Sequence, residues 1–360
     1  MQIGLVGLQY SGKTTLFNTL SQIGNIPQNT VTEKASIEVV KIPDKRLDIL
    51  TEIFNPKKKV NATIEIYDIP GLRTAEDGKL RITNNFLNEV KNNDALFYVV
   101  RQFKEESVLH PLNKIDALND IQFLENEFLF HDLAFLENRL EKLKKEVQKT
   151  KDDRLKRELP IIEICLSHVE KELPLRNLIL DQNDKKLLSG YQLMTLKPLV
   201  IAINFDDQLI ETADAYVKKI REVINDQTVE IIPFFAQLEY ELSKLSEDDK
   251  IVFMEEYGIK ESALVKILSA SYKSLGLQSF FTVGEDETRA WTIKKNYTAQ
   301  EAAGVIHTDF YNKFIRAEVV SYEDFINYKS FAKCKEAGVW RLEGKEYIVK
   351  DGDILNIRHS

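Results

Sequence analysis

The chain has 360 residues, of which 43% are hydrophobic and 29% are charged, and its formal net charge is −8. This composition is typical of a soluble globular protein with two or three domains, and the acidic balance argues against a general nucleic-acid binder. No apolar run approaches the roughly 18 residues of a membrane span, and the first residues predict a strand rather than a secretory signal. The two cysteines, Cys165 and Cys334, predict neither a disulfide framework nor a metal site. We therefore expect a cytoplasmic protein without membrane or DNA partners.

Short apolar runs alternate with amphipathic stretches through much of the chain. The expected strands are 1–6, 35–42, 63–69, 95–100, 199–204 and 229–235, and helices are expected at 14–22 and 44–53. Strands that alternate with helices predict an α/β domain with a mostly parallel sheet covered on both faces.

The middle of the chain has a different pattern. Apolar residues recur at spacings of three and four, which predicts one buried stripe of a long helix. These residues are Leu133, Leu136, Leu140, Leu143 and Val147. A charged stretch follows, and a second apolar-striped helix is expected over 161–169. We predict an inserted α-helical coiled-coil arm over 120–192, and the pattern leaves open whether it is only structural or binds a partner.

The last 80 or so residues predict a separate small α+β domain, because short strands surround one helix. Strands are expected at 280–283, 290–293, 315–320, 347–349 and 354–357, with a helix over 299–310. Asp351-Gly352-Asp353 predicts a hairpin turn. The predicted domains are a discontinuous α/β domain at 1–119 and 193–276, the arm at 120–192 and a C-terminal domain at 277–360.

The clearest motif follows the first strand, where GLQYSGKT at 7–14 fits G-x-x-x-x-G-K-[ST] in full. Glycines let the backbone N–H groups fold around phosphates, and the helix N-terminus adds positive potential. Lys13 is expected at the β- and γ-phosphates, and Thr14 at Mg²⁺. The residues expected to bind nucleotide here are Gly7, Gln9, Tyr10, Ser11, Gly12, Lys13, Thr14 and Thr15. The alternative, two glycines that serve only a turn, is the weaker interpretation.

A nucleotide hydrolase also needs a carboxylate near the metal. Asp68 ends the strand at 63–69 and begins a D-x-x-G motif that closes at Gly71, so we expect Asp68 to act at the metal. Thr32 lies in a polar stretch where a threonine could contact Mg²⁺ and the γ-phosphate, although an ordinary loop threonine is the alternative.

Two features depart from GTPases of the Ras type. Leu72 stands where those enzymes place a water-orienting glutamine. The strand at 199–204 ends in Asn204-Phe205-Asp206-Asp207, which lacks the lysine of the guanine-specific Asn-Lys-x-Asp motif. Residues 113–116 match that motif literally, but no apolar strand ends there, and we interpret the match as a coincidence.

The pattern resembles the Obg-like ATPases, also called YchF-type ATPases. The segments that carry the resemblance are PDKRLDILTEIFNPKKKVNATIEIYDIPGL, NNFLNEVKNNDALFYVVRQF, RAWTIKKNYTAQEAAGVIHTDFYNKFIRAEVVSYEDF and LEGKEYIVKDGDIL. It covers nearly the whole chain. It implies a P-loop NTPase G domain, a coiled-coil arm and a C-terminal TGS domain of the ubiquitin-like β-grasp kind. It also implies a Mg²⁺-dependent ATPase that prefers ATP over GTP and associates with ribosomal RNA through the TGS and helical domains.

The resemblance also assigns residues. Asn204 and Asp207 fall on the family's Asn-x-x-Glu, with aspartate in place of glutamate. Phe235, Ala236 and Gln237 fall on its Ser-Ala-Gln base-contact segment. His110 falls on a histidine thought to assist hydrolysis, although an ordinary loop histidine is the alternative.

Other departures from the family suggest a divergent member. The glycine-rich switch is reduced to one glycine, Gly78, and a family cysteine is Gln102. The expected catalytic residues are Lys13, His110 and Thr32, and the expected metal ligands are Thr14, Thr32 and Asp68. The alternatives are a GTPase of the same fold and a nucleotide-dependent scaffold with little turnover. Lys294, Lys295, Lys313 and Arg316 form either an RNA-facing patch or scattered surface charge.

Overall fold

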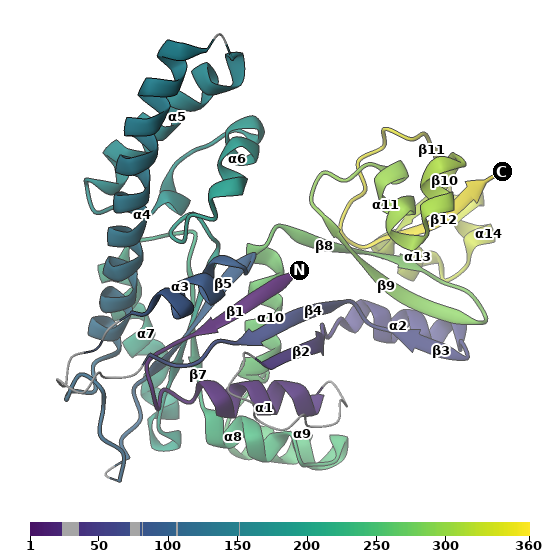
Figure 1. Cartoon of the computed structure of the whole chain (residues 1–360). Coiled ribbons are helices and arrows are strands. Elements are labelled where there is room, and N and C mark those ends of the chain that lie inside the picture. The colour runs from purple at the N-terminus through teal and green to yellow at the C-terminus, as the bar shows by residue number, and fades with distance from the viewer. Residues whose placement is uncertain (24–35, 73–79, 81, 106, 151) are drawn as a thin grey trace. The chain divides into compact units, whose positions relative to one another are not determined.

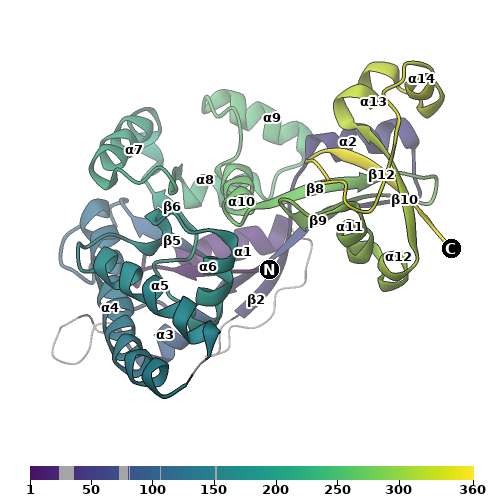
Figure 2. The same ribbon diagram turned by 90° about the horizontal axis from the view of Figure 1, so that it is seen from above.

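The computed structural model describes residues 1–23, 36–72, 80, 82–105, 107–150 and 152–360. Contacts divide the chain into two compact units (Figures 1 and 2). The first comprises Met1–Glu38 and Glu65–Ile267, and the second comprises Val39–Ile64 and Leu268–Ser360. The domain limits expected from the sequence stay a prediction.

The first unit is built on a six-stranded sheet whose order is β2-β4-β1-β5-β6-β7. Its strands are β1 (Gln2–Val6), β2 (Ser36–Lys41), β4 (Thr63–Asp68), β5 (Ala95–Arg101), β6 (Leu199–Asn204) and β7 (Glu230–Phe234). β1 pairs in parallel with both β4 and β5, and β5–β6 and β6–β7 are also parallel. Parallel strands end at the same edge of a sheet, so the segments after β1, β4 and β6 lie together there. The predicted α/β fold is confirmed.

Helices cover the sheet because its central strands are apolar on both sides. β5 and β6 are buried along their whole length. On one face, the apolar residues of α3 (Asn84–Lys91), of the first turns of α4 (Ala117–Lys149) and of α7 (Ile210–Ile224) join the core. Helices α1 (Lys13–Ile23) and α8 (Ala236–Leu242) lie on the other face (Figure 1). The sequence after α8 adds α9 (Glu247–Glu256) and α10 (Ala263–Ser274).

The inserted arm is a pair of helices, α4 and α5 (Asp153–Val169), followed by the short α6 (Gln182–Leu188) (Figure 1). Leu136 and Leu143 of the predicted stripe are buried against Ile162 and Cys165 of α5. α5 begins well before the predicted start at residue 161. Asp152 caps it by accepting from the Arg154 N–H, and the charged residues that follow are good helix formers.

The second unit is a mixed sheet of order β11-β10-β12-β8-β9-β3 with helices packed on it. Its strands are β3 (Lys58–Val60), β8 (Leu277–Thr282), β9 (Glu287–Lys294), β10 (Phe314–Ser321), β11 (Arg341–Glu343) and β12 (Asp353–His359). Its helices are α2 (Lys45–Phe54), α11 (Ala299–Ile306), α12 (Thr308–Asn312), α13 (Tyr322–Tyr328) and α14 (Phe331–Glu336). The predicted α+β architecture of the C-terminal part is confirmed.

Three local predictions in this unit were wrong. The helix expected over 299–310 is two helices, because His307 has an extended backbone and its Nδ1 accepts from the Asp309 N–H to cap α12. Residues 347–349 form no strand beyond a single bridge between Ile348 and Thr298. The turn at 351–353 exists, with Gly352 at φ +87°, but it closes no hairpin, since β12 pairs with β10 and β8.

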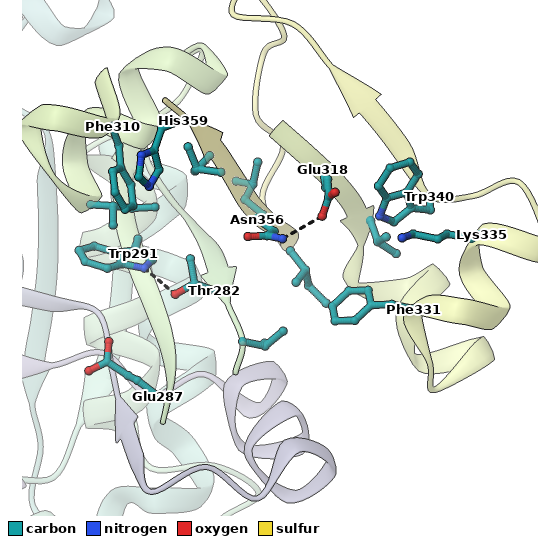
Figure 3. Close-up of a pocket in the computed structure, with 16 residues that line it drawn as sticks. Thr282, Glu287, Trp291, Phe310, Glu318, Phe331, Lys335, Trp340, Asn356 and His359 are labelled. Carbon is teal, nitrogen blue, oxygen red and sulfur yellow. Dashed lines mark hydrogen bonds between the residues drawn. The ribbon is translucent and has the colours of Figure 1, made fainter. Parts of the chain in front are cut away.

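A cavity of about 630 Å³ lies in this second unit (Figure 3). Its lining mixes aromatic side chains such as Trp291 and Trp340 with charged side chains of both signs, among them Glu318 and Lys335. Among the described residues, the structure contains no helix with the length and apolarity needed to span a bilayer.

Candidate nucleotide-binding site

The loop between β1 and α1 has the geometry that the motif at 7–14 predicts. A Cβ on Gly7 would lie 2.5 Å from the Val99 carbonyl oxygen, so only glycine fits. Gly12 has φ +93°, and a Cβ there would lie 2.2 Å from Asn204 Nδ2. Tyr10 also has a positive φ, +65°, and its side chain is exposed. The loop is therefore tightly curved and held against β5 and β6.

The end of β4 supplies a carboxylate to this loop. Lys13 Nζ donates to Asp68 Oδ1 at 2.5 Å, and both side chains are mostly shielded from solvent. Leu8 and Leu72 form a parallel bridge, and the Gln9 N–H donates to the Leu72 carbonyl at 3.2 Å. The D-x-x-G segment therefore lies directly against the P-loop, as the strand order requires.

Thr14 and Thr15 lie in the first turn of α1, and both are exposed. The Thr14 hydroxyl and the Asp68 carboxylate are hard oxygen ligands of the kind that Mg²⁺ takes, and both flank Lys13, so the residues present fit this ion. Gly71 approaches Gln9, whose Cα would lie 3.5 Å from a Cβ added to Gly71. Thr32, predicted to join this group, lies outside the described residues.

Asn204 at the end of β6 connects two loops. Its Nδ2 donates to the Ser11 carbonyl and its Oδ1 accepts from the Ala236 N–H, each at 3.1 Å. The side chain is almost completely buried, with 2% of Asn204 exposed. Both polar ends of the amide are thus used to hold the P-loop and the start of α8 in register.

The other predicted base-contact residues lie in the segments that follow β6 and β7. Asp207 follows β6 and is partly buried, and burial raises its pKa, with further contributions from the carboxylates of Asp206 and Glu241. Phe235 precedes α8 and its ring centroid lies 6.0 Å from that of Phe205. Gln237 is exposed and donates to Glu241 at 2.8 Å. Phe205 stands where guanine-specific proteins have lysine, and its burial gives it a packing role.

His110 lies in the segment between β5 and α4, and protein groups contact both of its ring nitrogens. Nε2 lies 3.0 Å from Asp120 Oδ2, and Nδ1 accepts from the Leu112 N–H at 3.2 Å. The His110 and Asp120 side chains are 3% and 2% exposed. Burial and then Arg101 lower the pKa of His110, whereas burial raises the pKa of Asp120 to about 7. Because Nδ1 accepts from the Leu112 N–H, the ring proton lies on Nε2 and faces Asp120.

Sequence reasoning did not single out Asp120 or Arg101. Arg101 is a charged residue at the end of the apolar run of β5, and it is almost completely buried. The signal that the sequence offered for Arg101 was a cation directly at the end of an apolar run. Residues 113–116, in contrast, form local structure, because Asp116 caps α4 and accepts from Lys114 at 2.6 Å.

Comparisons with known proteins agree with this geometry. Two family models match: one described as "50S ribosome-binding GTPase" at residues 2–129, and YchF-GTPase_C, described as "Protein of unknown function (DUF933)", at residues 277–360. A curated protein of Haemophilus ducreyi named Ribosome-binding ATPase YchF is 38% identical over 361 residues, covering 99% of this chain and 98% of that protein. A Bacillus subtilis protein of the same name is 38% identical over 363 residues, with the same two coverages.

Solved structures extend the similarity to three dimensions. The Schizosaccharomyces pombe YchF GTPase superposes with a TM-score of 0.87 at 30% identity, covering 99% of this chain and 97% of that one. A GTP-binding protein of Pyrococcus horikoshii, 19% identical with a TM-score of 0.61 and complete coverage of both chains, shares the fold. Full-length similarity to the curated relatives, together with the P-loop and its neighbouring carboxylate, shows that this chain belongs to the YchF family.

Proposed function

We propose that this chain is a Mg²⁺-dependent nucleotide hydrolase that prefers ATP to GTP and acts as a ribosome-associated regulatory switch in the cytoplasm. The observation that carries the proposal is the meeting of Lys13 and Asp68, 2.5 Å apart, between the P-loop and the end of β4. The proposal assigns Lys13 to the phosphates and Asp68 to the metal, and their closeness supports these two roles.

The proposed chemistry relies on positioning and electrostatics. Backbone N–H groups of residues 7–14 and Lys13 bind the phosphates, and Thr14 and Asp68 would hold Mg²⁺. When bound, the ion offsets negative charge on the phosphates. The oxygen of a water molecule bonds to the γ-phosphorus as the bond to the ADP oxygen breaks, which gives ADP and phosphate without a covalent enzyme intermediate.

His110 and Thr32 are the residues proposed to assist this step. His110 would orient or deprotonate the attacking water, since Leu72 cannot take the part of a glutamine. In the structure the ring of His110 is bonded to Asp120 and to the Leu112 N–H. Its participation therefore requires one of these two hydrogen bonds to be exchanged for one to water.

The ATP preference rests on the base side of the site. Guanine selection depends on an Asp that follows Asn-Lys, and here Phe205 replaces the lysine and is packed against Phe235. The names of the curated relatives, Ribosome-binding ATPase YchF, support the same preference and the association with ribosomes.

The remaining parts of the chain complete this proposal. We assign the C-terminal α+β part from residue 277 as a TGS domain and the helices of 120–192 as a coiled-coil arm, and both would contact ribosomal RNA. Two alternatives have specific support. The S. pombe relative is called a GTPase, which favours GTP as the ligand. The engagement of His110 by protein groups favours a scaffold that binds nucleotide with little turnover.

Calorimetric titration of the nucleotide-free protein with ATP and with GTP, in the presence of Mg²⁺, tests the proposal. Tighter binding of ATP supports the assignment of Asn204 and Asp207. Tighter binding of GTP would show that, with Asp207 and Phe235 in place of the family's residues, the base pocket favours guanine. The ATP assignment would then be withdrawn. Binding of neither nucleotide would contradict the hydrolase proposal itself.

A further inference from the structure

The inserted arm carries a groove that lies apart from the residues of the nucleotide site. Helices α5 and α6 form it, and it encloses about 1060 Å³. Its lining comprises Asp153, Arg154, Lys156, Arg157, Pro160, Ile161, Ile164, Asn183, Asp184, Lys186 and Leu187. The α5 members recur at spacings of three and four, so they share one face of that helix.

The floor of the groove is aliphatic. Ile161 is nearly buried, whereas Ile164, one turn further along, is 53% exposed. Leu187 of α6 packs at the edge of the arm core. Pro160 has no N–H and so leaves the carbonyl of Lys156 without its usual donor in the helix. The floor thus offers apolar surface and one backbone acceptor.

The rim of the groove is cationic, although the chain as a whole carries a net charge of −8. Lys156 pairs with Asp153 at 3.2 Å, which leaves Arg154, Arg157 and Lys186 against the single carboxylate of Asp184. Within the part of the chain that the structure describes, these three cations have no ion-pair partner. The rim therefore has an excess of two positive charges.

The opposite side of the arm shows that this excess is local. Where α4 meets α5, Arg139 bonds Glu158 at 2.7 Å and Glu146 at 3.1 Å, and Lys144 lies 3.4 Å from Glu163. Two cations between these helices, Arg139 and Lys144, are thus neutralised by carboxylates of the arm. Those at the groove lack such a partner and are available to an external one.

We propose that this groove binds an acidic amphipathic helix of a partner protein. Aliphatic side chains at positions i, i+3, i+4 and i+7 of that helix would cover Pro160, Ile164 and Leu187, and its flanking carboxylates would pair with Arg154, Arg157 and Lys186. The lining contains no aromatic side chain. Single-stranded RNA is bound by stacking on aromatic residues beside cations, so the aliphatic floor favours a protein helix over RNA.

The test uses the full-length protein and a labelled synthetic helix of about 18 residues, which spans about 27 Å. Glutamates occupy one face of this peptide and leucines the other, and a scrambled peptide of equal composition and a labelled oligouridylate serve as further probes. Binding is followed by fluorescence anisotropy at about 0.1 M salt, where exposed charges are partly screened.

Two variants probe the groove, and each has a matched control. Arg154→Glu with Arg157→Glu reverses the rim charge, and Lys218→Glu with Lys219→Glu makes the same charge change on exposed positions of α7. Ile164→Ser removes an apolar side chain from the floor of the groove. Its control, Val223→Ser, removes an apolar side chain from the surface of α7, where Val223 is 56% exposed. Thermal melting and nucleotide turnover are measured for all of them, and neither is expected to change.

The expected result is that the amphipathic peptide binds the wild type, that each groove variant weakens this binding about tenfold, and that both controls stay within about twofold. The scrambled peptide should bind at least about tenfold more weakly. The proposal would be overturned if the groove variants bound the peptide as tightly as the wild type does, or if the peptide did not bind at all. Oligouridylate binding that depends on the same residues, without peptide binding, would reassign the groove to RNA.

Discussion

Asn204 gives the sharpest test of how the nucleotide site is held together. Replacement by alanine removes the bond to the Ser11 carbonyl and the bond to the Ala236 N–H, both in a buried place. A buried polar group left without a partner costs about 1–3 kcal/mol, so the two together predict a loss of about 2–6 kcal/mol in the free energy of unfolding. Because the amide joins the P-loop to the start of α8, nucleotide affinity should fall as well.

Urea denaturation measures the first effect, and calorimetric titration with ATP and Mg²⁺ measures the second. Asn204→Asp is the informative companion, since it keeps the acceptor for the Ala236 N–H but faces the Ser11 carbonyl with a second acceptor. It should destabilise the protein at least as much as alanine, because it also buries a charge. Asn18→Ala, on an exposed position of α1, is the control. A loss below about 0.5 kcal/mol for Asn204→Ala, with unchanged affinity, would refute the bracing role.

Three further predictions follow from the same region. Gly12→Ala should abolish nucleotide binding in calorimetry, because the new Cβ meets Asn204 Nδ2 at 2.2 Å and φ is +93°; normal affinity would contradict this. Burial raises the pKa of Asp120 from 3.8 to about 7, so the stability due to its protonated form is full below pH 4 and is lost as pH rises toward 7. Urea melts should therefore show the wild type losing stability relative to Asp120→Asn between pH 4 and pH 7, and a constant difference over that range would be the contrary result. His110→Ala should lower kcat for ATP more than about tenfold with little change in KM, and an unchanged kcat would favour the scaffold alternative.

The sheet and the conformation of the loop at 7–14 could be predicted because local sequence determines them. The apolar runs of β1, β5 and β6 are short and clear, and Gly7, Gly12 and Lys13 occur at a spacing that only a phosphate loop explains well. Asp68 could be placed because a parallel sheet brings the ends of its strands to one edge.

Interactions between distant segments could not be predicted. β3 pairs with β9 through Lys58 and Glu287, which are far apart in the sequence. β12 likewise pairs with β10 and β8 rather than with the residues before its turn. The break at His307 is local, but it depends on a ring nitrogen that caps the next helix, which the apolar pattern does not mark. The same holds for the site: the sequence marks His110 and Asn204, but only the structure shows that Asp120, Ser11 and Ala236 are their partners.

The central proposal has two parts: the meeting of Lys13 and Asp68 makes this chain a nucleotide hydrolase, and the base side of the site gives it a preference for ATP. The most direct test is steady-state phosphate release from ATP and from GTP, with Mg²⁺, by the wild type and by Lys13→Ala. The account predicts a higher kcat/KM for ATP than for GTP, and a loss of at least about a hundredfold in the variant, because the developing charge on the phosphates loses its cation. Equal turnover by the two proteins, or a higher kcat/KM for GTP, would contradict it.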